Sequence, residues 1–215
     1  MGRPPAAPLF TYNPGIQATA ISQVRETIEA GWYLGAEVVT VHANPRGSFE
    51  LDEYRDDIVA LFNDLGDFAA SCDVSIGIET GYPNTVADFA GLFLDIDHDA
   101  VGATVDVGHI VAYVPRGGLE SECAVQTYND TLMHIVTLLG SEIHHFHLND
   151  VRRADWCDHR AVGSGIVDYD RLFAFLSELD YRGTFALELE EAETDQALET
   201  SKLFVDDLVS RYGSA

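Results

Sequence analysis

Acidic and imidazole side chains end several short apolar runs of this sequence. The runs are VVTVHAN with His42, SIGIETG with Glu79, VGATVDVGHI with Asp106 and His109, HHFHLND with His147, and TFALELEE with Glu188. A buried strand gains nothing by finishing on such groups, because a polar or charged side chain costs free energy in an apolar layer. Parallel strands that repeat the pattern would gather these groups at one end, where they could hold a divalent metal.

The strongest ligand set among these residues is Glu79, Asp106, His147 and Glu188. Carboxylate oxygens and an imidazole nitrogen from four strands suit one ion of Mn²⁺, Mg²⁺, Co²⁺ or Zn²⁺. Any one of the four alone is more simply explained as a solvated residue at the mouth of a loop. We expect a metal site because all four occupy the same end of a strand.

Two further histidines are placed to act beside this metal. His109 follows Asp106 by three residues and would stand just past the strand, over the ion. There it could polarise a substrate oxygen or bind a second metal. His42 could line the substrate site or serve as a ligand of the second metal, and the sequence does not separate these two roles.

Two residues beyond His147 are predicted to contact the substrate. His159 precedes a Gly-x-Gly turn, which can bring backbone N–H groups near a ligand, and a second metal could lie near His109 and His159. Arg153 lies six residues past His147, in a loop expected to cover the site. An arginine there can clamp a hydroxyl, carboxylate or phosphate group. The alternatives are a plain surface arginine, or Arg152 or Arg160 in the same role.

Helical patterns alternate with the strand candidates along the chain. Apolar residues recur at helical spacing between glycine stops and polar N-cap candidates, which include Asn84, Asp168 and Thr194. The expected helices cover residues 17–34, 51–70, 84–94, 120–139, 169–179 and 194–211. Strand and helix repeat at intervals of roughly 30 residues, which is typical of βα units and a parallel sheet.

The strand faces favour a closed barrel over an open sheet. Residues two positions before Glu79, Asp106 and Glu188 are small or weakly polar, whereas the opposite faces carry Val, Ile, Phe and Leu. This division suits a (β/α)₈ TIM barrel, whose interior is crowded and whose outside packs against helices. Five clear strands and one doubtful strand at residues 8–13 give about six βα units, so we expect a single TIM-barrel-like domain over residues 1–215 that is shortened at its N-terminus.

The composition predicts the cellular environment of the protein and the partners that it does not bind. The chain has 36 acidic and 12 basic residues, a net charge of −24, and Lys202 as its only lysine. At molar salt the Debye length falls to about 3 Å, so this self-repulsion would be screened, and the composition resembles that of proteins from salt-adapted archaea. The alternative is an ordinary acidic enzyme. Three widely spaced cysteines and the lack of a signal-peptide core predict a cytoplasmic protein. The acidic balance argues against a nucleic-acid partner, and no apolar run predicts a membrane span.

The motifs together resemble those of the xylose-isomerase-like TIM barrel superfamily. IETG, DVGH, HLND, the turn at residues 159–165 and RGTFALELE occur in the family's order and approximate spacing, from about Pro8 to the C-terminus. The resemblance implies a metal held by the four ligands named above. It also implies that Glu79 and Glu188 move protons on either side of a substrate carbon, that His109 contacts a substrate oxygen, and that Arg153 binds the substrate.

We therefore expect a divalent-metal-dependent isomerase or epimerase of a sugar or sugar phosphate, working through an enediolate. HLND, a later histidine and the Gly-x-Gly turn are also similar to endonuclease IV, an apurinic-site nuclease with three zinc ions. Cys157 stands where that family has an aspartate ligand, and no histidine precedes His42. The third alternative is an inactive incomplete barrel, which could close its seam by forming a homodimer.

Overall fold

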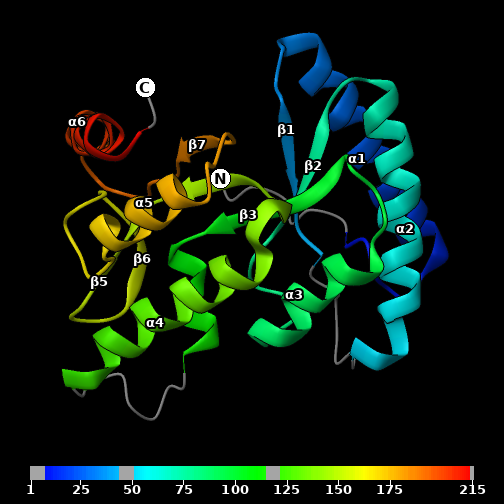
Figure 1. Cartoon of the computed structure of the whole chain (residues 1–215). Coiled ribbons are helices and arrows are strands. Elements are labelled where there is room, and N and C mark those ends of the chain that lie inside the picture. The colour runs from blue at the N-terminus through cyan, green and yellow to red at the C-terminus, as the bar shows by residue number, and fades with distance from the viewer. Residues whose placement is uncertain (1–7, 44–50, 115–121, 214–215) are drawn as a thin grey trace. The chain divides into compact units, whose positions relative to one another are not determined.

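The computed structural model describes residues 8–43, 51–114 and 122–213 (Figure 1). The chain divides into two compact units, Met1–Ala103 and Thr104–Ala215. The single domain expected over residues 1–215 stays a prediction. Within the described residues, no helix is both long enough and apolar enough to cross a membrane.

The first unit contains parallel strands that alternate with helices, as the sequence predicts. Hydrogen bonds join its strands in the order β1-β2-β3, and β1 and β2 run side by side with Val39 opposite Ile76 and Val41 opposite Ile78 (Figure 1). The elements are α1 (Pro14–Leu34), β1 (Val38–Val41), α2 (Leu51–Ser71), β2 (Ser75–Glu79), α3 (Val86–Asp95) and the start of β3 (Val101–Asp106).

The doubtful strand at residues 8–13 is not formed. Leu9 and Phe10 are buried, but the backbone there is irregular and leads into α1. The Asn13 side chain accepts hydrogen bonds from Gly15 N and Ile16 N, and Pro14 takes the first helical position. An asparagine cap followed by proline is a strong helix start, so α1 begins three residues before the predicted start at residue 17. The expected six strands of the sheet are therefore five in the described part of the chain.

Two other helix starts differ from the sequence prediction by one residue. Thr85, not Asn84, caps α3, and its hydroxyl oxygen accepts a hydrogen bond from Asp88 N at 3.1 Å. Helix α6 (Thr194–Tyr212) has Glu193 at its N-cap position, while the Thr194 hydroxyl donates to Glu191 O. Residues 120 and 121 of the helix expected over 120–139 lie outside the described residues.

The second unit continues the repeat and adds an antiparallel pair that the sequence did not predict. Its parallel strands follow the order β3-β4-β7, and β5 pairs with β6 between β4 and α5 along the chain. The elements are the end of β3, the 3₁₀ helix η1 (Gly108–Tyr113), α4 (Glu122–Leu139), η3 (Gly140–Glu142), β4 (Ile143–Leu148), β5 (Asp150–Arg152), β6 (Cys157–Arg160), α5 (Tyr169–Glu178), β7 (Thr184–Leu187) and α6.

Strand β4 presents its two faces as the alternation predicts. Phe146 is fully buried and lies 5.8 Å from Phe185 of β7, which stacks on Phe173 of α5 at 5.2 Å between ring centroids. On the opposite face, His145 Nδ1 hydrogen-bonds Thr184 Oγ1 at 2.7 Å. Successive strand residues point to opposite sides, so His147 shares the face of His145 and points away from the helices.

Candidate metal centre

Asp106 is the most buried acidic residue predicted to bind metal. It ends β3 and is fully buried. Its Oδ1 accepts hydrogen bonds from the backbone N–H of His109 at 3.1 Å and from Asn149 Nδ2 at 3.0 Å. Its Oδ2 faces two imidazoles, with His147 Nδ1 and His159 Nε2 each 3.7 Å away. The carboxylate is thus held on one side and presented on the other.

His147 and Glu188 meet at the carboxyl ends of neighbouring strands. His147 lies opposite Ala186 in the β4–β7 register, and Glu188 directly follows β7. His147 Nδ1 and Glu188 Oε2 are 2.6 Å apart, with 15% of the histidine and 46% of the glutamate side chain exposed. This hydrogen bond lowers the pKa of Glu188, an effect that partial burial opposes and the charge of His147 reinforces. Glu188 is therefore held as a carboxylate.

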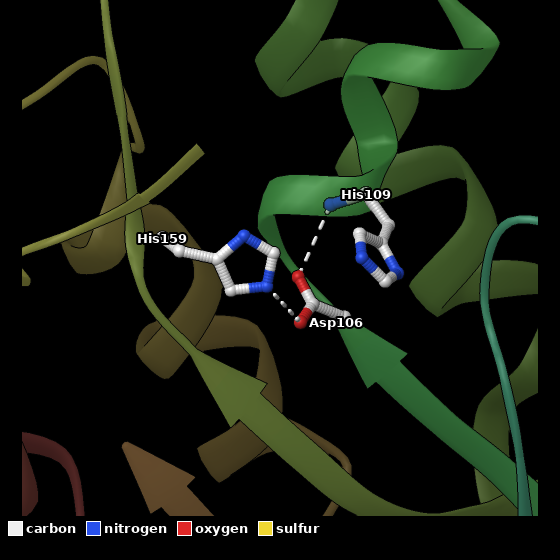
Figure 2. A group of neighbouring side chains, drawn as sticks. All are labelled: Asp106, His109 and His159. Carbon is white, nitrogen blue, oxygen red and sulfur yellow. Dashed lines mark hydrogen bonds and ion pairs between the residues drawn. The ribbon is translucent and has the colours of Figure 1, made fainter. Parts of the chain in front are cut away.

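His109 and His159 approach Asp106 from two other elements (Figure 2). The ring of His159, on β6, points at the carboxylate, and the two imidazole rings lie edge to face at 5.5 Å. Asp106, His109 and His159 each offer a ligand atom within 4.8 Å of the others. Burial lowers the pKa of His159, but the nearby carboxylates of Asp106 and Asp158 raise it more, so the net shift is upward.

The β5–β6 pair is the element that positions His159, and sequence reasoning missed it. The turn between the strands contains Trp156 with φ +56°, and His159 itself has φ +55°. Asn149 Oδ1 accepts a hydrogen bond from His159 N at 3.3 Å, and His159 O accepts one from Glu190 N at 2.8 Å. The strand is therefore tied on one side to the end of β4 and on the other to the segment after Glu188.

The Gly-x-Gly turn has a different role from the predicted one. Gly163 N and Gly165 N donate to Asp150 Oδ2, at 3.0 and 2.8 Å. A Cβ on Gly165 would lie 2.2 Å from Val151 O, so this close approach requires glycine. These two N–H groups thus anchor the turn to a buried aspartate instead of facing a ligand.

The first unit brings Glu79 and His42 together. Glu79 ends β2 and is only 3% exposed, while His42 directly follows β1. Glu79 Oε2 and His42 Nε2 form an ion pair, with the histidine side chain 59% exposed. Adjacent parallel strands thus end on two of the predicted site residues.

Arg153 lies exposed in the turn between β5 and β6. In that turn its neighbour Arg152 makes a two-bonded ion pair with Asp155. The contact of Arg153 with a substrate stays a prediction.

Asp106, His147 and Glu188 fit a divalent cation by their chemistry. Carboxylate and imidazole ligands bind such ions at about 2.0–2.2 Å, so two ligand atoms of one ion lie up to about 4.4 Å apart. The separation of 3.7 Å between Asp106 Oδ2 and His147 Nδ1 falls inside this limit. The residues offer two anionic oxygens and one imidazole nitrogen, a mixture that suits Mn²⁺, Co²⁺ and Zn²⁺ and, with more water ligands, Mg²⁺.

Parallel βα units with functional groups at the carboxyl ends of their strands define the class of TIM-barrel-like α/β proteins. The family model described as "Xylose isomerase-like TIM barrel" matches residues 4–206, and the chain belongs to this family. An uncharacterised protein of Methanocaldococcus jannaschii is 24% identical over 197 residues, which are 85% of this chain and 62% of that protein. The chain thus spans less than two thirds of that relative.

Solved structures confirm the fold. A D-tagatose 3-epimerase-like protein matches with a TM-score of 0.67 and 22% identity, over 94% of this chain and 73% of that one. An L-ribulose 3-epimerase matches with a TM-score of 0.71 and 14% identity, over 98% of this chain and 74% of that one. The IOLI protein with a bound zinc atom matches with a TM-score of 0.71 and 21% identity, over 97% of this chain and 75% of that one.

Proposed function

We propose that the protein is a divalent-metal-dependent isomerase or epimerase of a sugar or sugar phosphate. The observation that carries the proposal is the meeting of Asp106, His147 and Glu188 at the carboxyl ends of β3, β4 and β7, in a chain of this family. Structural neighbours that are named as sugar epimerases support the substrate class. A neighbour with bound zinc supports a metal cofactor.

Glu79 is proposed as the fourth ligand. It ends β2 as Asp106 ends β3, and the carboxyl ends of successive parallel strands carry the site in folds of this class. Within the first unit, its pairing with His42 orients the carboxylate. Glu79→Gln is expected to weaken metal binding strongly, and His42→Gln, which removes the orienting partner, is expected to weaken it less.

The bound ion would supply Lewis-acid polarisation of adjacent carbonyl and hydroxyl oxygens of the sugar. Glu188 is suited to accept a proton from the intervening carbon, because its hydrogen bond to His147 keeps it ionised and nearly half of its side chain is exposed. Glu79 is proposed to return the proton from the other side. His109 would contact a substrate oxygen, and Arg153 and His159 would bind the rest of the substrate.

As the alternative to contacting the substrate, His109 and His159 would hold a second metal. The observation behind it is that Asp106, His109 and His159 form a ligand group of their own within the second unit (Figure 2). Metal analysis that yields two ions per chain would favour this arrangement and, with it, the nuclease alternative. One ion per chain is expected if His109 and His159 serve the substrate.

The proposal is tested by stripping the protein with a chelator, adding back Mn²⁺, Mg²⁺, Co²⁺ or Zn²⁺ singly, and assaying a panel of ketoses, aldoses and their phosphates. The assay belongs in molar KCl, because the net charge of −24 favours a protein adapted to a salt-rich cytoplasm. Activity is expected only with metal. Turnover by the stripped enzyme at the same rate would overturn the proposal.

The Glu188→Gln variant tests whether Glu188 acts in catalysis and not only in folding. The variant is expected to lose turnover by about 10²–10⁴-fold, the usual contribution of a general base, with the fold intact. Glu190→Gln is the matched control, since Glu190 is exposed two residues further on and loses the same charge. Cleavage of abasic-site DNA without sugar turnover would favour the nuclease, and metal binding without either activity would favour an inactive barrel.

A further inference from the structure

We infer that Asn149 is a positioning residue that fixes which oxygen of Asp106 is presented to a cation. The inference rests on the proposed function, because it concerns a ligand of the proposed metal. Asn149 directly follows β4 and is fully buried. Its amide bridges the strand end that carries Asp106 and the strand that carries His159.

The contacts of Asn149 leave its amide one orientation. Nδ2 donates to both oxygens of Asp106, at 3.0 Å to Oδ1 and 3.2 Å to Oδ2. Oδ1 of the amide accepts from His159 N. Reversing the amide would place its oxygen against a carboxylate and its NH₂ against an N–H group, so the network cannot be satisfied the other way round. Tyr169 OH also donates to Asn149 O, which fixes the backbone.

In this orientation the two oxygens of Asp106 have different roles. Oδ1 accepts from Asn149 and from the backbone N–H of His109, both on one side. Oδ2 has the longer contact with the amide and faces the imidazoles of His147 and His159. The geometry therefore assigns Oδ2 to the cation and Oδ1 to the protein.

An amide is suited to this task because it donates hydrogen bonds without carrying charge. A lysine or arginine in its place would form an ion pair with Asp106 and cancel the negative charge that attracts a cation. Outer hydrogen-bond partners that orient a ligand typically contribute about 10–100-fold to metal affinity.

Gly108 leaves the space that Asn149 needs. A Cβ at Gly108 would lie 2.3 Å from Asn149 Oδ1 and 2.9 Å from the Cβ of Asp158. No side chain fits there unless the amide moves. Gly108→Ala should therefore displace the amide without deleting it.

The test measures binding of Mn²⁺ and Co²⁺ to the chelator-stripped full chain by calorimetry and records the visible absorption of the Co²⁺ form. Asn149→Ala is expected to weaken affinity by about 10–100-fold and to shift the Co²⁺ absorption bands.

Asn129→Ala is the matched control. Asn129 is also a buried asparagine of the second unit that makes three hydrogen bonds, to Val125 O, Ile166 O and Asp168 N. It should lose stability while keeping wild-type affinity and spectrum.

Gly108→Ala gives an independent second variant should Asn149→Ala fold poorly. It is expected to weaken metal binding in the wild-type background and to have little further effect beside Asn149→Ala. Wild-type affinity and an unchanged Co²⁺ spectrum in either single variant would overturn the inference and leave the proposed function standing. A wild-type protein that binds no divalent ion would overturn both.

Discussion

Two buried aspartates of the second unit, Asp106 and Asp150, are used in opposite ways. Both are fully buried, and both lie at strand ends. Asp106 has Oδ1 held by two N–H donors, whereas Oδ2 has one longer amide contact and faces imidazoles. Asp150 is surrounded by four backbone N–H donors at 2.8–3.1 Å. These donors belong to Val151, Gly163, Gly165 and Val167.

The difference shows that burial of a carboxylate does not by itself mark a metal ligand. Burial raises the pKa of Asp150, and the four backbone hydrogen bonds oppose that shift. The charge of Asp150 is thus satisfied by the chain that folds around it. Asp106 keeps an oxygen toward groups that can themselves bind a cation, so its charge is available for chemistry.

The largest expected effect comes from removing the charge of Asp106. Asp106→Asn should reduce Mn²⁺ affinity by more than the 10–100-fold typical of an outer partner, since a direct ligand is lost. Stability of the metal-free protein should change little, because the repulsion between Asp106 and Glu188 and the attraction between Asp106 and His159 oppose one another. Calorimetry measures the loss of Mn²⁺ affinity, and thermal unfolding without metal measures the stability. A large loss of metal-free stability would make Asp106 a structural residue like Asp150.

Asp150→Asn should show the reverse pattern. The amide keeps one acceptor oxygen, so two backbone N–H groups would face an NH₂ group. At about 1–3 kcal/mol for each unsatisfied buried donor, the free energy of unfolding should fall by about 2–6 kcal/mol. Urea unfolding of the metal-free protein measures this loss. The folded fraction should bind Mn²⁺ with nearly unchanged affinity. An Asp150→Asn variant as stable as wild type would contradict the structural role of Asp150.

The smallest effect concerns an exposed aspartate, Asp155, in the turn between β5 and β6. Hydrogen bonds from Arg152, at 2.6 and 2.9 Å, lower the pKa of Asp155 to about 2 from its ordinary 3.8. A folded pKa below the unfolded one means that the pair stabilises the turn above about pH 4. That contribution is lost as pH falls toward 2. Carboxyl NMR titration should find the low pKa in wild type and a value near 3.8 in Arg152→Gln.

Much of the candidate centre follows from the sequence, because strand periodicity is local. Asp106, His147 and Glu188 were each predicted from a short apolar run that ends on a polar residue, and these three do meet. By the same alternation His145 shares the face of His147, where it hydrogen-bonds Thr184. Thus βα order and strand polarity together predict the convergence.

The supporting residues were not predicted, since their roles depend on contacts made far along the chain. Asn149 lies two residues after His147, and this spacing was a signal that it shares the same side. Its partners at positions 106 and 159 are not visible in the sequence. The β5–β6 pair was missed because CDHR has no apolar alternation, and its shape depends on left-handed backbone at Trp156 and His159.

The anchoring of the turn to Asp150 has a consequence for engineering. Its donors are main-chain amides, which every amino acid except proline supplies, so their presence does not depend on side-chain identity at most of the turn. Gly163 and Gly165 are constrained by shape, but exposed Ser164 between them is not. Substitutions at Ser164 should therefore retain the turn and lose only the hydrogen bond that the Ser164 hydroxyl donates to Ala161 O.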